Sequence, residues 1–180
     1  MNKFEEKTIN TTSIYEGKVV DLRVAEVSLP NGKTAKRELI KHPGAVAVIP
    51  ITKDNKIVLV EQFRKPLEKS LVEIPAGKVE IGEAPEVTAR RELEEETGYT
   101  TNELSFVTSF YTSPGFADEL MHIYITDELE KMDTQPESDE DEFVEVLELT
   151  LEEAKELVEQ ERIHDAKTNY AILYLHALGR

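Results

Sequence analysis

Apolar and polar positions along the first third of the chain follow the pattern of extended strands. Residues 14–29 are rich in valine and partly alternating, and a second extended run, 33–42, follows the turn signal "PNG". Alternation on both sides of a short glycine-containing turn predicts a β-hairpin. The near-continuous apolar run "GAVAVIPIT" and the run "KIVLVEQFR", separated by "KDN", then predict two buried strands.

The remaining two thirds of the chain mix helical and extended patterns. Residues 83–97 contain no glycine and end at Gly98, as a helix with a C-terminal glycine cap does. Thr150 and Glu153 form a capping-box pattern for a helix over 151–161, and a more apolar helix ends near Gly179. Further strands are expected over 103–112, 119–126 and 143–149. Without regular βαβ alternation, this order predicts an α/β (α+β) fold: a mixed sheet covered by helices, with an added N-terminal antiparallel sheet.

Composition limits the classes of protein to consider. A length of 180 residues suits one domain with a small extra sheet, and 39% hydrophobic and 32% charged residues are typical of a soluble globular protein. No apolar run reaches the length of a membrane span, and the first residues do not have the pattern of a signal peptide, so a cytoplasmic location is expected. With no cysteine, the chain has no disulfide framework or thiolate metal site.

The net charge of −16 disfavours binding to nucleic acid or to an anionic membrane. An anionic small substrate would need local cations or well-placed arginines.

The helix predicted over 83–97 carries clustered acids. At 100° per residue, Glu92, Glu95 and Glu96 fall within an arc of about 100°, whereas Glu94 points nearly opposite to Glu96. Their mutual repulsion is unfavourable, and in the last turn the helix dipole also disfavours negative charge. A bound cation would remove both penalties, and oxygen ligands suit Mg²⁺ or Mn²⁺. Taken alone, an acidic run on a helix is also explained by a solvated surface.

The wider stretch "GKVEIGEAPEVTARRELEEETGY", residues 77–99, favours the metal site. Its glycines, glutamates and arginine are spaced as in the Nudix box, and the chain thereby resembles the hydrolases of nucleoside diphosphates linked to another moiety. The resemblance implies an α/β/α sandwich and a reaction that splits a diphosphate. It also implies that Glu92 and Glu96 bind a divalent metal ion with Glu95 close by, and that the backbone carbonyl of Ala76 completes the site. Arg91 would pair with a carboxylate and hold the cluster in place.

Other segments resemble the ADP-ribose pyrophosphatase branch of that family. They include "EQFRKP", "LVEIPAGK" and the "SPG" whose Pro114 lies sixteen residues after Gly98. The resemblance implies that Arg64 contacts the phosphate or terminal ribose of ADP-ribose or a related nucleoside diphosphate sugar, with Glu73 binding nearby. Arginine suits this role because it donates two parallel hydrogen bonds to phosphate oxygens.

The N-terminal hairpin and the acidic loop also receive roles from this resemblance. Arg37 and Glu38 would contact the adenine end of the substrate, in a homodimer formed through the N-terminal sheets, although a surface ion pair explains them equally well. The loop "PESDEDEF" would supply the catalytic base, Glu140 or Glu142, with Glu95 as the remaining candidate.

These expectations divide the chain into an N-terminal sheet region, 1–42, and a Nudix domain, 43–180. The expected reaction is the metal-dependent hydrolysis of ADP-ribose to AMP and ribose 5-phosphate. Two alternatives stay open. One is the same chemistry on another nucleoside diphosphate sugar or a nucleoside triphosphate. The other is a non-catalytic ligand sensor built on this fold, such as a transcriptional regulator.

Overall fold

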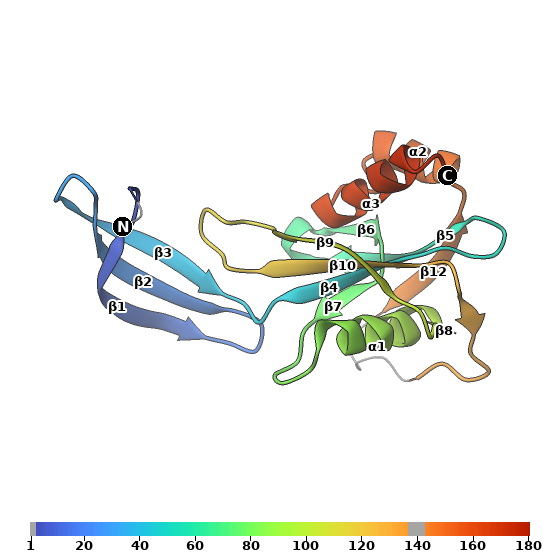
Figure 1. The fold of residues 1–180 in the computed structure, drawn as a ribbon, viewed down its shortest axis with the longest axis horizontal. Coiled ribbons are helices and arrows are strands. Elements are labelled where there is room, and N and C mark those ends of the chain that lie inside the picture. The colour runs from blue at the N-terminus through green and yellow to red at the C-terminus, as the bar shows by residue number, and fades with distance from the viewer. Residues whose placement is uncertain (1–2, 137–142) are drawn as a thin grey trace. The chain divides into compact units, whose positions relative to one another are not determined.

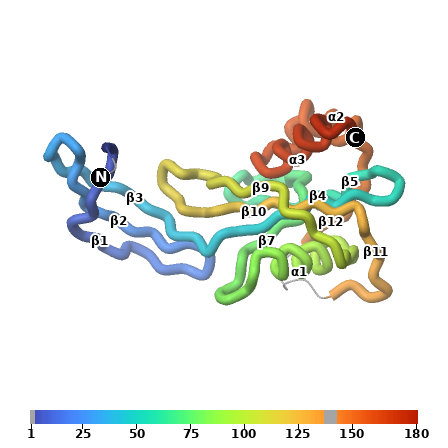
Figure 2. The backbone as a smooth tube through the Cα atoms, viewed as in Figure 1, coloured from blue at the N-terminus to red at the C-terminus, as the bar shows by residue number. Residues whose placement is uncertain are grey.

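The computed structural model describes residues 3–136 and 143–180. Its contacts divide the chain into two units, each with its own strands (Figures 1 and 2). Unit 1 comprises residues 1–44 and 110–120, and unit 2 comprises residues 45–109 and 121–180. The expected boundary after residue 42 falls near the end of the first segment of unit 1, but that unit also includes the 110–120 segment.

Unit 1 contains an antiparallel sheet in the order β1-β2-β3. Its strands are β1 (Lys7–Glu16), β2 (Asp21–Ser28) and β3 (Thr34–Lys41). The single strand expected over 14–29 is wrong, because the chain turns at Gly17, whose N–H donates to the Val20 carbonyl at 3.0 Å. Strand β1 could not be predicted from hydrophobic pattern because all ten of its residues are exposed. The turn expected at "PNG" is confirmed, with Gly32 at φ +80°.

Unit 2 contains mixed sheets covered by helices. The strands that lie wholly or mostly in it are β4 (Ala45–Pro50), β5 (Ile57–Arg64), β6 (Lys69–Glu73), β7 (Ala76–Lys78), β8 (Tyr99–Thr100), β9 (Ser105–Tyr111), β10 (Leu120–Thr126), β11 (Glu130–Lys131) and β12 (Val144–Leu149). They form the orders β7-β4-β10-β9, β12-β5-β6 and β11-β8, in which β4 pairs parallel to β10 and β5 pairs antiparallel to β12 and β6. The expected mixed sheet is therefore confirmed.

Helices cover both sides of the strands of unit 2 (Figure 1). They are α1 (Pro85–Thr97), α2 (Leu151–Glu159) and α3 (Ala166–Ala177), with a short 3₁₀ turn, η1 (Lys65–Leu67). Helix α1 lies on one side, and α2 and α3 lie on the other, which gives the expected α/β/α layers. The capping box of Thr150 and Glu153 is present at the start of α2. Among the described residues, no helix has the length and apolar character needed to cross a membrane.

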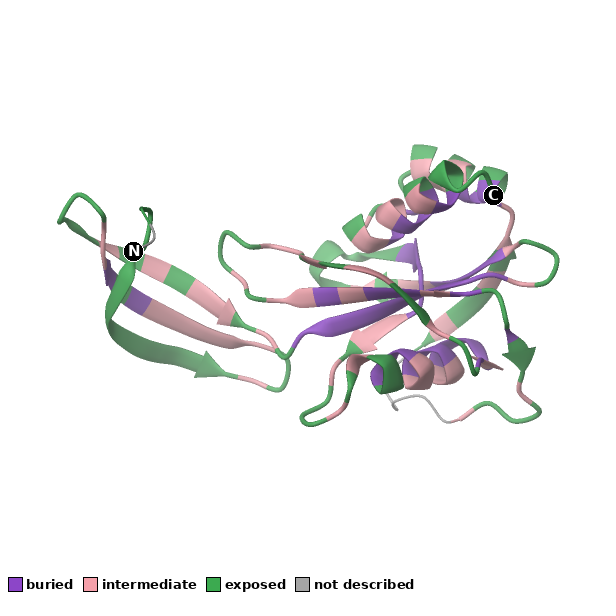
Figure 3. Ribbon diagram, viewed as in Figure 1, coloured by how far each residue is buried: buried purple, intermediate pink, exposed green. Residues whose placement is uncertain are grey.

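The core of unit 2 lies between these layers, where β4 is buried at every position, the first half of β5 is buried and β10 is buried at four of its seven positions (Figure 3). Ala89 and Leu93 of α1 pack with Val46, Val48 and Val58 in one apolar cluster. Burial of such side chains stabilises the fold by about 1.5–3 kcal/mol for each large one. This cluster fixes α1 against the sheet and thereby fixes the direction of its glutamates.

Candidate active site

Helix α1 presents two of its glutamates to the protein interior. Pro85 stands in its first turn, and Gly98 ends it in the left-handed conformation at φ 68°, with its N–H donating to the Glu94 carbonyl at 3.0 Å. Glu92 is 8% exposed and Glu96 is 3% exposed, on the same face as the apolar Leu93. Carboxylates are rarely buried to this degree unless they are paired or coordinate a metal.

Strand β7 lies directly beside these two carboxylates. The Ala76 N–H donates a hydrogen bond to Glu96 Oε2 at 3.0 Å. A Cβ atom placed on Gly77 would overlap the carboxyl group of Glu92. Glycine is therefore needed at position 77 because the Glu92 carboxylate occupies the space that any side chain would fill.

Arg91 joins several acids of the same stretch. Its Nη1 lies 2.9 Å from Glu92 Oε1 and 2.8 Å from Glu95 Oε2, and its Nη2 lies 3.5 Å from Glu83 Oε2. Burial opposes the charge of Arg91, but Glu92 and Glu95 raise its pKa well above the ordinary value. Thr88 donates to Glu83 at 2.7 Å, and this hydrogen bond lowers the pKa of Glu83. Arg91 thus fixes one oxygen of each acid that it contacts.

The donor chemistry of this cluster fits a hard divalent cation. Two buried carboxylates, a third at Glu95 and the neighbouring Ala76 backbone offer only oxygen ligands, as Mg²⁺ and Mn²⁺ prefer. In the described part of the chain, no three acidic or histidine side chains are gathered in metal-site geometry. Instead, Glu92 and Glu95 are turned to Arg91, and Glu96 accepts from Ala76.

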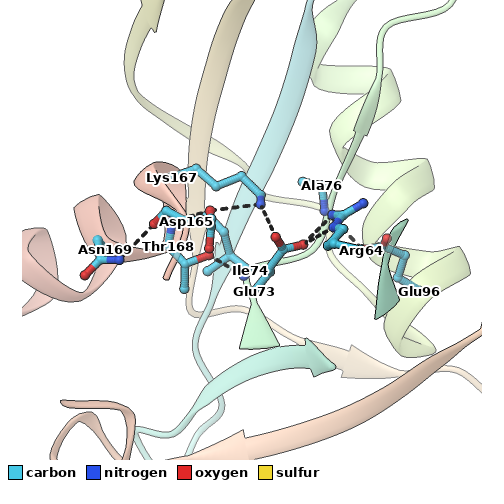
Figure 4. Close-up of polar contacts among 9 residues, drawn as sticks. All are labelled: Arg64, Glu73, Ile74, Ala76, Glu96, Asp165, Lys167, Thr168 and Asn169. Atoms are coloured by element: carbon cyan, nitrogen blue, oxygen red, sulfur yellow. Dashed lines mark hydrogen bonds and ion pairs between the residues drawn. The ribbon is translucent and has the colours of Figure 1, made fainter. Parts of the chain in front are cut away.

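Arg64 and Glu73 form a second part of the site, at the ends of β5 and β6 (Figure 4). Arg64 donates to Glu73 Oε2 from Nε at 2.9 Å and also from Nη2. Glu73 is 3% exposed, whereas the Arg64 side chain is 37% exposed. Burial lowers the pKa of Arg64, but Glu73 and then Glu96 raise it above its ordinary value. The guanidinium is therefore held by a buried carboxylate. It also lies close enough to Glu96 for the negative charge of that residue to raise the pKa of Arg64.

Sequence reasoning missed the residues of α3 that complete this second part. Lys167 Nζ lies 3.5 Å from Glu73 Oε1 and 3.0 Å from Asp165 Oδ1. Asp165 is the N-cap of α3 and accepts from the Thr168 N–H at 3.1 Å. The cap pattern of Asp165 was available in the sequence, but the pairing of Lys167 with Glu73 depends on the tertiary fold.

The other candidates lie in unit 1 or outside the described residues. Arg37 pairs with Glu6 through Nε at 2.9 Å and Nη2 at 2.6 Å, and Glu38 lies beside it on β3. The "SPG" segment forms a turn tied to the same strand, because the Ile40 N–H donates to the Phe116 carbonyl at 2.7 Å. Glu140 and Glu142 lie outside the described residues.

Comparison with known proteins identifies the family of the chain. The family model described as "NUDIX domain" matches residues 41–170, and the chain therefore belongs to the Nudix family. It is 61% identical to the "ADP-ribose pyrophosphatase" of Bacillus subtilis (strain 168), with 97% of this chain and 95% of that protein covered. It is also 60% identical to the "Methanol dehydrogenase activator" of Bacillus methanolicus, with 96% and 93% covered. A solved structure titled "Crystal structure of ADP compounds hydrolase" shares the fold at a TM-score of 0.84 and 21% identity, with 97% and 94% covered.

Proposed function

We propose that this chain hydrolyses ADP-ribose to AMP and ribose 5-phosphate in the presence of Mg²⁺ or Mn²⁺. In this reaction, water adds to one phosphorus atom and the bond from that phosphorus to the bridging oxygen breaks. The water's protons pass to the base and the released phosphate. The observation that carries the proposal is a pair of buried glutamates, Glu92 against Gly77 and Glu96 bonded to the Ala76 N–H, in a chain 61% identical to an ADP-ribose pyrophosphatase.

Different residues of unit 2 bind the metal ion, orient its ligands and bind the diphosphate. Glu92, Glu95, Glu96 and the carbonyl of Ala76 would hold the divalent cation, which supplies charge neutralisation and Lewis acidity toward the diphosphate. Arg91 orients Glu92 and Glu95 through its two short ion pairs. Arg64 offers a fixed guanidinium to a phosphate oxygen of the substrate, and Glu73 holds that guanidinium in place.

The substrate is tested with a panel of purified compounds. ADP-ribose, GDP-mannose, another ADP-sugar, NADH and ATP are each incubated with the protein and Mg²⁺, and the phosphate ester products are quantified. We expect ADP-ribose to give the highest kcat/KM of the panel. A clear preference for a nucleoside triphosphate would refute the substrate, and no turnover with any compound would favour the non-catalytic sensor. The name of the Bacillus methanolicus relative specifies no substrate. The panel therefore tests the substrate directly and does not depend on the name of either relative.

We further propose a homodimer formed through the sheet of unit 1. All ten residues of β1 are exposed in the single chain, including the apolar Ile9, Ile14 and Tyr15, each more than half exposed. Apolar side chains exposed along one strand are typical of a surface that another chain covers, and a small three-stranded sheet gains stability from such packing.

Light scattering after gel filtration tests the dimer. The protein should elute with twice the chain mass of 20.4 kDa, and Ile14→Glu should shift it to the monomer because a charge would be buried at the interface. Ile81→Glu, at a fully exposed apolar position in unit 2, is the matched control and should leave the mass unchanged. A monomeric wild-type protein at micromolar concentration would refute the proposal.

The cytoplasmic location stays a prediction that cell fractionation would check.

A further inference from the structure

The start of helix α3 is joined to the segment that leads from β6 to the carboxylate cluster. Thr168 Oγ1, which is fully buried, accepts a hydrogen bond from the Ile74 N–H at 3.0 Å. One residue earlier, Lys167 reaches the Glu73 carboxylate (Figure 4). Two residues further along the same segment, the Ala76 N–H donates to Glu96. The first turn of α3 is thus connected to both parts of the site through a segment of four residues.

The charges along this connection alternate in sign. Asp165, Lys167, Glu73 and Arg64 form a row of two acids and two bases, and each neighbouring pair is in contact. The side chains of Lys167 and Glu73 are 11% and 4% exposed. A buried charge is costly unless an opposite charge compensates it, so the loss of either base leaves an acid without full compensation.

The two oxygens of Glu73 serve different partners. Oε2 accepts both hydrogen bonds from Arg64, whereas Oε1 faces the ammonium group of Lys167. The two cations hold the carboxylate from both of its oxygens, and loss of Lys167 removes the ion pair at Oε1 that opposes rotation about the last side-chain bond. Lys167 is itself held by the N-cap aspartate, whose Oδ1 accepts from Lys167 Nζ at 3.0 Å and from the Thr168 N–H at 3.1 Å.

We propose that Lys167 is a positioning residue for hydrolysis: through Glu73, it fixes the Arg64 guanidinium in the orientation that receives the diphosphate. The inference rests on the proposed function, because it assigns the phosphate contact to Arg64. Only Arg64 in this row is substantially exposed, so it is the member that a substrate can reach. Helix α3 therefore contributes to substrate binding although Lys167 itself stays away from the substrate.

A double-mutant cycle between positions 64 and 167 tests this assignment. Lys167→Met, Arg64→Ala and the combined variant are compared with the wild-type protein in kcat, KM and thermal unfolding, with ADP-ribose or the best compound of the panel. Lys167→Met should lower kcat/KM by about 10- to 100-fold, the usual effect of misplacing a group that holds substrate. Most of that loss should appear in KM. In the Arg64→Ala background, the same substitution should lower kcat/KM by less than about 3-fold, because the group that it positions is already gone.

Two further variants separate positioning from a general loss of structure. Lys167→Arg keeps the charge and should recover most of the lost kcat/KM. Lys155→Met removes a lysine of helix α2 whose side chain is 37% exposed and lies 3.9 Å from Glu152, and it should leave kcat/KM near that of the wild type. If Lys167→Met does not fold, Lys167→Gln, which removes the charge and keeps a polar group beside Glu73, takes its place in the cycle.

The outcomes distinguish the inference from the proposed function. Absence of activity in the wild-type protein, or full activity in Arg64→Ala, would refute the function assigned to the chain or to Arg64. An active wild-type protein with an impaired Arg64→Ala variant, in which Lys167→Met acts equally in both backgrounds, would refute the positioning role alone. Loss of binding that disappears in the Arg64→Ala background would support it.

Discussion

Replacing Glu92 or Glu96 with glutamine is expected to lower the rate of ADP-ribose hydrolysis by about 10³-fold, because stabilisation of charge by a metal ion is worth several kcal/mol and each 1.4 kcal/mol corresponds to a tenfold change in rate. Glutamine keeps the shape of the side chain and removes its charge. Both positions are nearly buried beside β7, where an amide would be a weaker ligand for a hard cation. The kcat at saturating Mg²⁺ and the Mg²⁺ affinity measured by titration calorimetry check this expectation.

The two variants should differ in thermal stability without added metal. Glu96→Gln keeps an oxygen that can accept from the Ala76 N–H and relieves repulsion on the helix, so its melting temperature should be equal to or higher than that of the wild type. Glu92→Gln weakens the ion pair that joins Glu92 to Arg91 at 2.9 Å, so it should gain less or lose stability.

Glu94 provides a matched control on the same helix. Its Oε1 accepts from Thr100 Oγ1 at 2.5 Å, and its side chain points away from the cluster formed by Glu92 and Glu96. Glu94→Gln should therefore keep nearly the wild-type kcat and Mg²⁺ affinity. Near-normal rates in both Glu92→Gln and Glu96→Gln would show that these carboxylates do not hold a catalytic metal ion.

The parts of the fold that the sequence predicted correctly depend on local signals. Gly98 ends α1 in a conformation that glycine adopts without strain, and the Thr150–Glu153 capping box starts α2 with both of its reciprocal hydrogen bonds. The apolar run that became β4 is buried at every position. In each case, neighbouring residues contain the information, and no distant partner is needed.

The parts that sequence reasoning missed depend on pairing between distant segments. Strand β7 has three residues and β8 and β11 have two each, too few for a periodic pattern. The glycine requirement at position 77 arises from the side chain of Glu92, fifteen residues away, and Lys167 meets Glu73 across ninety-four residues. The acidic helix itself was predicted, but the division of its acids between Arg91 and the Ala76 N–H required the fold.

The segments that flank residues 137–142 are both joined to the candidate site. On one side, Gln135 Nε2 donates to the backbone carbonyl of Glu95 at 2.6 Å. On the other side, Val144 at the start of β12 pairs with Gln62 of β5, two residues before Arg64. Glu140 and Glu142 lie between these segments in the sequence, and the proposal that one of them is the base comes from the resemblance to the ADP-ribose pyrophosphatase branch.

Substitution of the base is expected to lower kcat by about 10²–10⁴-fold with little change in KM or Mg²⁺ affinity, because proton transfer is lost while binding is retained. Glu140→Gln, Glu142→Gln and the double variant are compared under saturating ADP-ribose and Mg²⁺. Glu145→Gln is the control, because it removes an exposed acid on the neighbouring strand β12 and should leave kcat unchanged. Near-wild-type kcat in both single variants and in the double variant would exclude the segment as the source of the base. Glu95, held by Arg91 at 2.8 Å, would then be the group to replace next.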